Sequence, residues 1–533
     1  MNCIQRFFDR LPEWKIILIT AVFAVLMGFY CLSGRILLSG DETRVAGIIR
    51  EFQFSSGPLF LPRLNGVPFL EYPPLYYWGG AFFISGLGVS YGTIKAMSAL
   101  SFCLSILLAY GLARRLKLDK SAAFFSAVML GSALAFFSTG RTCMVDITLG
   151  FFVLLAVFGF YSGMTASGWE SAVSYYILYA AGAGCAVMTK GLLGLALPGV
   201  ILFSLLLIRD ITGRRLHWKT WLVLGFASLA ALIPVACWAY ELYRWLGWDD
   251  FYEVMYANNV GRFSGSQADH KAPFYYYLQR LPELFQPWLL LIPFGLWKAW
   301  RDFRREHDHG ALFLLCAFLA PLVLLSVASA KRNVYLIPVY PAAMILAGSG
   351  LSFMLDRLCG RVKEEKLIRA GRLTGLVLIC LAAAAAVFLL LLYPALRPWA
   401  ILPLLFAAAG LFLFLRRDLP SGSLLLLLTL ATLLPYGEAV LPNRFSPEDN
   451  LESLFRRIGE LEDQGEKVYL LDPMERLRGA ATYYRGRLMP VRKRRDYDGR
   501  SREIWVLRQR DKKKTAPYGD HHYIVQMPDG KLL

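Results

Sequence analysis

Two carboxylates and a guanidinium stand close together in Asp41-Glu42-Thr43-Arg44, directly after a long apolar stretch. A carboxylate held where hydrocarbon meets water can act as a general base on a substrate whose polar part lies at that boundary. Helix-like sequence follows from Val45 to Phe54, so Asp41 can equally be a simple helix N-cap. Asp41 and Glu42 are therefore candidate catalytic residues, and Arg44 is a candidate ligand for an anion.

Two further carboxylates lie in segments of distinctive composition. Glu71 is the only charge in the run from Leu64 to Trp78, whose prolines break helices and whose aromatic residues suit a membrane surface. It is a candidate metal ligand or partner of a cation, or it simply faces water. Asp146 closes the turn 140–146 at the start of an apolar stretch, where an unpaired charge is costly, and is a candidate catalytic residue.

Several cationic residues occupy other polar turns, and each could bind a phosphate through charge-assisted hydrogen bonds. They are Lys190, Arg262, Lys331 and Arg332, with Tyr335 close by. Carboxylates for an acceptor and cations for an anionic leaving group are the parts that a phosphate-leaving transfer needs. The alternative for Lys190 is a lysine that only extends its ammonium group to the membrane surface.

His270 lies in the same polar loop as Arg262, within Ala268-Asp269-His270-Lys271. An imidazole can ligate a metal or donate a proton. A lone histidine more often does neither, so His270 and Glu71 together make only a doubtful metal site.

The rest of the chain must hold these residues in a membrane. It has 533 residues, of which 56% are hydrophobic and only 18% are charged, and its mean hydropathy is +0.45. This apolar excess is far above that of a soluble domain. Stretches of about 20 apolar residues, the length that crosses a bilayer, are predicted at 14–33, 93–113, 121–139, 146–166, 172–189, 193–208, 220–245, 284–300, 311–329, 334–355, 373–393, 398–415 and 422–441.

The basic residues set the orientation of these thirteen predicted spans. The net charge of +18 comes largely from short clusters in alternate connections, which the positive-inside rule places in the cytoplasm. This distribution favours lipid headgroups and anionic substrates over nucleic acid as partners. All candidate site residues then fall on the outer side, with the large loop 34–92 as the catalytic loop. The first span is expected to be retained, because no convincing cleavage pattern follows it.

The polar tail has a different character from the apolar part. Residues 443–533 combine a helical stretch from Asn450 to Glu466 with strand-like runs at 468–471, 504–507 and 523–526. We therefore predict two parts: a transmembrane domain over 1–442 and a small soluble α/β domain on the outer side. The nine cysteines all precede this tail and contain no CxxC pattern, so no disulfide framework is expected.

The outer motifs, taken in order, resemble those of the polyprenyl-phosphate-sugar glycosyltransferases related to ArnT and the protein O-mannosyltransferases, a C-type superfamily. The resemblance rests on Asp41 to Arg44, Leu64 to Trp78, the Asp146 turn, 188–191, 270–277 and 331–338. It implies an α-helical polytopic membrane protein of about 13 transmembrane helices, with amphipathic interfacial helices in the first outer loop and a C-terminal periplasmic α/β domain. It also implies the bacterial inner membrane and an undecaprenyl-phosphate-linked sugar donor.

The resemblance also assigns roles to single residues. Asp41 and Asp146 match the functional acidic positions of the family, Lys190 its donor-phosphate cation, Glu71 its loop glutamate and Tyr335 a cavity tyrosine; Arg262 matches the arginine before a phenylalanine. Two positions depart from the aminoarabinose transferases. Asn259 replaces a histidine that is thought to hold zinc with the loop glutamate, so this departure argues against a zinc requirement. Tyr72 replaces a lysine beside the donor site, so the donor sugar can differ.

The expected function is inverting transfer of a sugar, aminoarabinose-like or another pentose or hexose, from undecaprenyl phosphate to an outer acceptor. Lipid A or another envelope glycan or lipid is the favoured acceptor, and protein, as in the O-mannosyltransferases, is the alternative. A lipid or sugar transporter without bond chemistry would carry its charges nearer the middle of the spans. A catalytically silent scaffold that presents its basic tail to partners is the third possibility.

Overall fold

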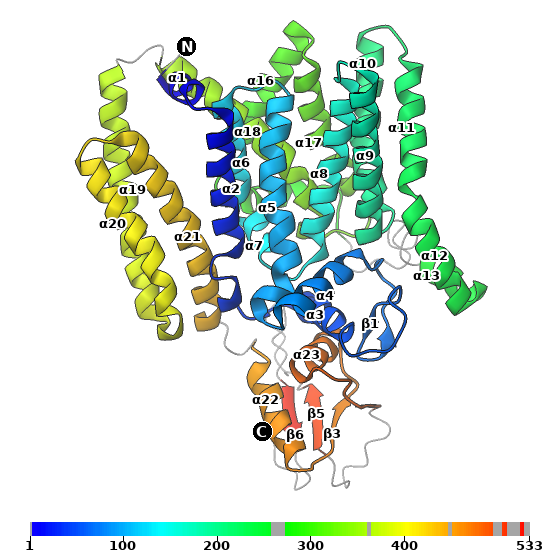
Figure 1. The fold of residues 1–533 in the computed structure, drawn as a ribbon. Helices are drawn as coiled ribbons and strands as arrows, with labels where there is room; N and C mark the ends of the chain where they lie inside the picture. Colours follow the sequence, from blue (N-terminus) through cyan, green and yellow to red (C-terminus); the bar gives the residue numbers. More distant parts are fainter. Residues whose placement is uncertain are drawn as a thin grey trace.

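In a computed structural model, the chain forms a bundle of long helices with a small α/β region at one end (Figure 1). The structure describes residues 3–256, 272–359, 364–445, 450–493, 504–508 and 523–526. The N-terminal helix α1 (Cys3–Arg10) lies at the end of the bundle opposite the α/β region. We call the end that carries the α/β region the site end.

Eleven helical segments among the described residues are long and apolar enough to cross a membrane. Isolated helices of this kind satisfy every backbone hydrogen bond within themselves, which hydrocarbon demands. They are built from α2 (Glu13–Phe29), α5 (Tyr91–Arg115), α8 (Val145–Met164), α9 (Trp169–Lys190), α10 (Leu193–Thr212), α11 (Trp218–Ala231) with α12 (Ile233–Leu246), α17 (His309–Val327), α18 (Tyr340–Cys359), α19 (Glu364–Leu392), α20 (Ile401–Leu415) and α21 (Leu419–Phe445).

Against the thirteen predicted spans, the residues that the structure describes contain eleven candidate spans, or twelve if one bent pair of helices is counted as a span. The stretch predicted at 121–139 is split into α6 (Lys120–Ser132) and α7 (Leu134–Gly140), which are bent by 65°. The stretch predicted at 284–300 does not form one long helix, because α16 (Leu291–Glu306) begins seven residues later and has only 16 residues.

Residues 276–306 nevertheless run from one end of the helix bundle to the other. The short helix α15 (Tyr276–Leu284) lies at the site end, where the Tyr276 hydroxyl donates to Asn333 at 2.8 Å. The later part of α16 lines a cavity with Leu116, which follows the last residue of α5. Together, α15 and α16 connect the two ends in the way that one span would.

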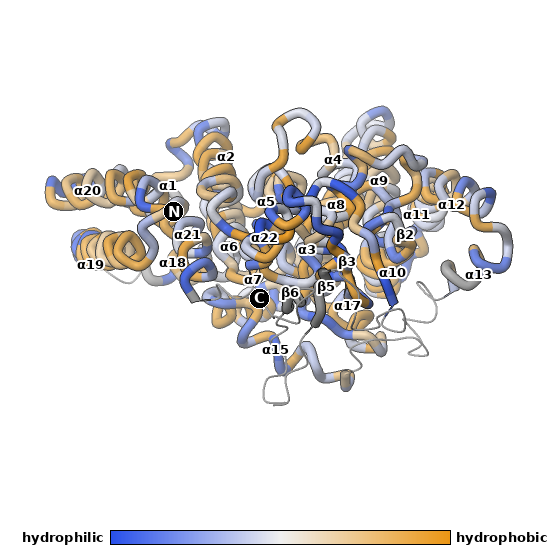
Figure 2. The backbone as a smooth tube through the Cα atoms, turned by 90° about the horizontal axis from the view of Figure 1, so that it is seen from below, coloured by the Kyte–Doolittle hydropathy of each residue, from blue (hydrophilic) through white to orange (hydrophobic). Residues whose placement is uncertain are grey.

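The membrane helices are arranged in a main bundle with two flanks. Figures 1 and 2 place α19 and α20 at one edge of the molecule, joined to the bundle by α21, and α11 and α12 at the opposite edge. Orange, hydrophobic stretches dominate these helices in Figure 2, as expected for surfaces that face lipid. The 3-10 helices η3 (Asn333–Val339) and η4 (Pro394–Ala400) lead into α18 and α20, and α13 (Trp248–Tyr256) follows α12.

The large loop between α2 and α5 folds over the site end. It contains η1 (Leu32–Gly34), α3 (Gly40–Glu51), a hairpin of β1 (Arg63–Leu64) and β2 (Val67–Pro68), and α4 (Leu75–Leu87). Asn65 and Gly66 form the two-residue turn, and both have positive φ, 54° and 82°. Asn-Gly is the pair that such a turn favours, because both positions require left-handed backbone.

The C-terminal region forms a four-stranded sheet flanked by helices. The strand order is β4 (Val491–Arg492), β3 (Val468–Leu471), β5 (Ile504–Arg508), β6 (Tyr523–Gln526), with β3 parallel to both neighbours and β6 antiparallel to β5. The three predicted strands are confirmed, and the predicted helix is α22 (Glu452–Asp463). A second helix, α23 (Glu475–Arg485), was not predicted, although Pro473 before it and Gly486 after it are ordinary helix boundary signals.

Helix α23 packs against α3 through two glycines. A Cβ on Gly47 would lie 2.6 Å from the Gly479 Cα, and a Cβ on Gly479 would lie 2.3 Å from the Thr43 carbonyl oxygen. The two backbones can approach this closely only because neither residue has a side chain. Arg476 lies beside Gly40, and Gly486 lies beside Arg50, so the two helices run in the same direction. This contact joins the C-terminal region to the large loop.

We expect Gly479→Ala to destabilise the protein by about 1–3 kcal/mol, because the new methyl group has to displace the α3 backbone. Gly86→Ala in α4 is the control, because a Cβ there meets nothing within 4 Å. It should be neutral or stabilising, by up to about 1 kcal/mol. Thermal unfolding of the detergent-solubilised proteins measures both, and equal unfolding midpoints for the two variants would contradict the close contact.

Candidate active site

Ser39 caps α3 and leaves Asp41 free for other partners. The Ser39 hydroxyl oxygen accepts the Glu42 N–H at 3.1 Å, and the Glu42 carboxylate accepts the Ser39 N–H at 3.4 Å. This reciprocal pair is a capping box. The interpretation of Asp41 as the N-cap is therefore wrong, because Asp41 lies one position inside the helix, after Gly40.

Glu42 is buried within a dense set of donors. Its carboxylate binds the Arg35 guanidinium through two hydrogen bonds, of 2.7 and 3.2 Å, and accepts the backbone N–H groups of Leu38 at 3.0 Å and Cys143 at 3.4 Å. Burial alone would raise the pKa of Glu42, but the charges of Arg35 and Lys95 and these hydrogen bonds lower it to about 2. Its carboxylate is only 1% exposed, so its placement favours a structural role over the predicted catalytic one.

Further buried charges continue from this pair into the membrane helices. Arg35 also binds Glu438 of α21 at 2.7 Å, and Glu438 binds Arg141 at 2.8 Å. Arg141 is fully buried and donates to the carbonyl oxygens of Met27 and Gly28, each at 3.0 Å. This chain of charges connects α3 to α2, α21 and the turn before α8. We call Arg35, Glu42, Arg141 and Glu438 the buried ion cluster.

Asp41 lies between two arginines. Arg44, one turn further along α3, donates to one carboxylate oxygen at 2.8 Å, and Arg332 binds the other in a close contact. Burial alone would raise the pKa of Asp41, but the charges of Arg332 and Arg44, with a smaller contribution from Lys190, hold that pKa below its usual value. The carboxylate is 22% exposed, so Asp41 is charged and still accessible.

Asp146 and Lys190 form a second, deeper ion pair. Asp146 lies in the first turn of α8 and Lys190 is the last residue of α9, and both side chains are buried. Two aromatic rings cover the ammonium group: its nitrogen lies 4.6 Å from the centre of the Tyr335 ring and 5.6 Å from that of Tyr72. Tyr72, noted in the sequence only as the loss of a cation, therefore lies beside the candidate phosphate ligand.

The two ion pairs meet at η3. Arg332 immediately precedes this helix and reaches Asp41, and Tyr335 lies one turn later over Lys190. Three cations face two carboxylates in this set, and the Glu475 carboxylate also binds Arg44, at 2.7 Å, so the six formal charges balance. We call Asp41, Arg44, Asp146, Lys190, Arg332 and Tyr335 the charged site. Lys190 and Arg332 are cations that are partly shielded from water, and such groups bind anions such as phosphate.

The other predicted site residues are not joined in the same way. Lys331 turns away from Asp41 and donates to the backbone carbonyl oxygens of Ala272, at 3.0 Å, and Ala328. Glu71 lies within electrostatic range of Arg44, whose pKa it helps to raise against the effect of burial. Arg262 and His270, like Asn259, lie outside the described residues. Among the residues that the structure describes, no group of three or more His, Cys, Asp or Glu side chains could hold a metal ion.

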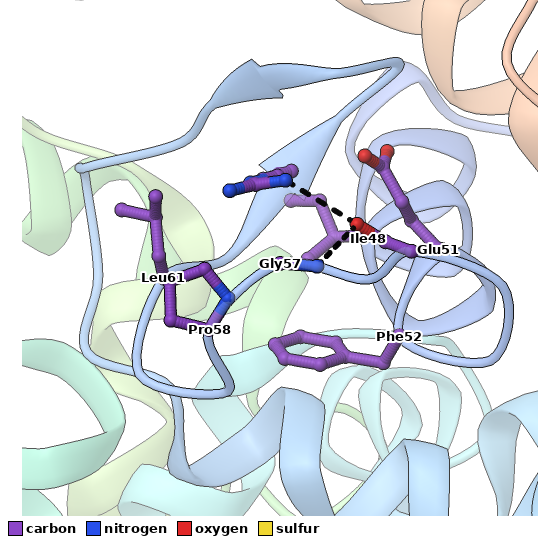
Figure 3. Close-up of a pocket in the computed structure, with 8 residues that line it drawn as sticks. Ile48, Glu51, Phe52, Gly57, Pro58 and Leu61 are labelled. Atoms are coloured by element: carbon purple, nitrogen blue, oxygen red, sulfur yellow. Dashed lines mark hydrogen bonds between the residues drawn. The ribbon is translucent and has the colours of Figure 1, made fainter.

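A separate small cavity lies at the other end of α3 (Figure 3). Glu51 and Phe52 line one side of it, and Pro58 and Leu61 face them. Its volume of about 10 Å³ holds about one water molecule. It is too small for a sugar, so the charged site remains the candidate for substrate chemistry.

The fold and the charged site define the class: a multi-span membrane protein with a partly buried ionic site at one end of its helix bundle. Residues 18–252 match the family described as Dolichyl-phosphate-mannose-protein mannosyltransferase. The predicted resemblance is thereby confirmed.

Curated relatives narrow the comparison. Two relatives are undecaprenyl phosphate-alpha-4-amino-4-deoxy-L-arabinose arabinosyl transferases. The protein of Edwardsiella ictaluri is 31% identical to this chain over 385 residues, and that of Erwinia tasmaniensis is 30% identical over 384 residues. Each alignment covers 72% of this chain but only 65% of the relative, so the chain spans just under two thirds of their length. The crystal structure of ArnT from Cupriavidus metallidurans bound to undecaprenyl phosphate shares the fold, with a TM-score of 0.67 and 22% identity over 91% of this chain and 86% of that one.

Acid is expected to weaken the protein through Glu42. Because the pKa of Glu42 falls from an ordinary 4.5 to about 2 on folding, its contribution is complete above about pH 4.5 and is lost as the pH falls towards 2. The difference corresponds to about 3 kcal/mol. Thermal unfolding in detergent between about pH 6 and about pH 3 measures the loss.

In Glu42→Gln, the stability should be lower at neutral pH and its decline in acid should be flatter, because no carboxylate remains to be protonated at that position. Glu460→Gln is the control, because Glu460 is half-exposed in a pair with Arg457. It should keep the wild-type slope. A Glu42→Gln variant with the full acid decline would show that other groups cause it.

Proposed function

We propose that the protein is an inverting glycosyltransferase that moves a sugar from undecaprenyl phosphate to an acceptor outside the cytoplasm. The observation that carries the proposal is the charged site, in which two carboxylates and three cations meet at one end of a membrane bundle. The printed activity of the curated relatives, transfer of 4-amino-4-deoxy-L-arabinose from undecaprenyl phosphate, supports this reaction type. The donor sugar is aminoarabinose-like or another pentose or hexose.

Lys190 would bind the donor phosphate. When the bond between the anomeric carbon and the phosphate oxygen breaks, the electron pair stays on that oxygen, and a nearby cation stabilises the added charge. Tyr335 and Tyr72 shield the ammonium group from water, which strengthens this interaction. Asp146 holds Lys190 in place and lies where it can stabilise positive charge that builds on the sugar.

Asp41 would orient the acceptor on the opposite face of the sugar, where attack inverts the anomeric carbon. An efficient general base has a pKa near the working pH, whereas the pKa of Asp41 lies below its usual value. This favours an acceptor oxygen that is already ionised, such as a phosphate of lipid A, over a neutral hydroxyl. Arg332 and Arg44 would then bind the acceptor anion, and Asp41 would hold both guanidiniums in position. With a hydroxyl acceptor, Asp41 would have to take the proton.

The proposed location is the bacterial inner membrane, with the site end and the C-terminal α/β region in the periplasm. Basic residues at the opposite end support this orientation under the positive-inside rule. They include Arg114 and Arg115 in the last turn of α5, Arg209 in the last turn of α10, and Arg304 and Arg305 in the last turn of α16. The large loop, with α3 and α4, would then lie at the periplasmic surface of the inner membrane.

Two alternatives remain as outcomes of the test. A protein acceptor is favoured by the description of the matching family, which transfers mannose to protein. A transporter without bond chemistry would move intact donor between the two sides of proteoliposomes. The position of Asp146 and Lys190 at helix ends, rather than in the middle of a span, favours chemistry over transport.

The test follows sugar transfer in proteoliposomes that contain purified protein, undecaprenyl-phosphate-linked aminoarabinose and lipid A. Wild-type protein should consume the donor only when acceptor is present. Asp41→Asn should reduce turnover by at least about a hundredfold, the loss typical of one electrostatic catalytic group, without changing the unfolding temperature by more than a few degrees. Asp302→Asn, whose carboxylate pairs with Lys298 at the opposite end of the bundle, is the control and should retain activity.

Replacement of Lys190 should change the kinetic constants differently from replacement of Asp41. Lys190→Met should raise the donor KM and lower kcat, because it removes the cation that binds the phosphate in both the ground state and the transition state. Wild-type turnover by Asp41→Asn would exclude the assigned site. Movement of intact donor without transfer would favour the transporter, and transfer to added peptides in place of lipid A would favour the protein acceptor.

A further inference from the structure

The glycine contact between α3 and α23 also brings two charged side chains together, one turn before the glycines. On α3, Arg44 lies one turn before Gly47, and on α23, Glu475 lies one turn before Gly479. Residues separated by three or four positions lie on the same face of a helix. Because the helices run in the same direction, the close backbone approach brings the side chains of Arg44 and Glu475 together.

Arg44 divides its guanidinium between two carboxylates from distant parts of the chain. One terminal nitrogen donates to Asp41 at 2.8 Å, and the other donates to Glu475 at 2.7 Å. The face of the Arg44 guanidinium lies 5.3 Å from the centre of the Phe69 ring. The Arg44 side chain is only 11% exposed, whereas Glu475 is 51% exposed and lies in the first turn of α23. Glu475 thus reaches a largely buried arginine from the surface.

We infer that Glu475 is a positioning residue of the active site, acting on Asp41 through Arg44. The inference rests on the proposed function. Glu475 binds one terminal nitrogen of Arg44 and so fixes the direction from which the other terminal nitrogen meets Asp41. It also offsets part of the Arg44 charge, so that Asp41 is not fully neutralised and can share Arg332 with an acceptor anion. The C-terminal α/β region therefore completes the site.

The solvent exposure of Glu475 sets the expected loss of turnover when it is replaced. A half-exposed ion pair is screened by water, so Glu475→Gln should lower turnover by only about two- to five-fold. Charge reversal in Glu475→Lys should have a larger effect, at least about tenfold, because it places a second cation against Arg44. Glu475→Asp should retain part of the wild-type turnover. The loss should appear in kcat, with the donor KM unchanged, because Glu475 has no role at Lys190.

The matched control is Glu460→Lys. Glu460 lies in α22 of the same region, is also 51% exposed and pairs with Arg457 at 2.6 Å, as Glu475 pairs with Arg44. It should leave both kcat and the unfolding temperature close to those of wild type. A double-mutant cycle tests whether Glu475 acts through Arg44: in an Arg44→Gln background, Glu475→Lys should change turnover by less than about two-fold. All variants are assayed as full-length protein in the proteoliposome transfer assay.

The outcomes separate this inference from the proposed function. Wild-type protein that consumes no donor overturns both. Active wild type with equal turnover in Glu475→Lys and Glu460→Lys overturns the inference alone. So does a full additional loss from Glu475→Lys in the Arg44→Gln background, or a loss confined to the donor KM. The expected combination of a kcat loss, partial retention by Glu475→Asp and non-additivity with Arg44→Gln supports it.

Discussion

The buried contact between Glu42 and Arg35 is the interaction on which the rest of the charged site depends. Two full charges at a membrane boundary are costly to bury, and they are tolerated here because Glu42 also accepts backbone N–H groups and Arg35 also binds Glu438. Glu438 and Arg141 extend this compensation into the membrane helices. Removal of any member leaves an uncompensated charge in a low dielectric, so α3 is held in one position rather than laid loosely on the bundle.

Because α3 is held in one position, the Asp41 carboxylate also has a defined position. Ser39 and Glu42 satisfy the free N–H groups of the helix start, and Asp41 is left to face Arg332 from a segment almost three hundred residues away. The short η3 then joins Asp41 to Lys190, because Arg332 and Tyr335 are one turn apart. The start of α3 and the tight turn of η3 therefore set the spacing between Asp41 and Lys190.

Apolar length was enough to predict most of the membrane helices, and short strand-like runs of mostly apolar residues were enough for the three strands of the tail. At 284–300, hydropathy predicted one long helix, whereas the structure has the short helices α15 and α16, which together connect the two ends of the bundle. Asp41, Asp146, Lys190 and Tyr335 were predicted and lie together, although their roles stay predictions. The part played by Arg332 was not separable from that of Lys331 by sequence, since only the turn of the backbone decides which side chain faces Asp41. Helix α23 was missed although local boundary signals surround it, and the role of Glu475 was missed because its partner, Arg44, is 431 positions distant.

The join between α3 and α23 also imposes an order on biosynthesis. Arg44 is synthesised before Glu475 and Gly479, which follow it by more than four hundred residues. A nascent chain can insert all of its membrane helices and bury its ion cluster while α3 still presents an uncovered glycine face. The contacts of Arg44 are complete only when α23 packs against α3, so a product truncated before α23 would occupy the membrane without the Glu475 contact.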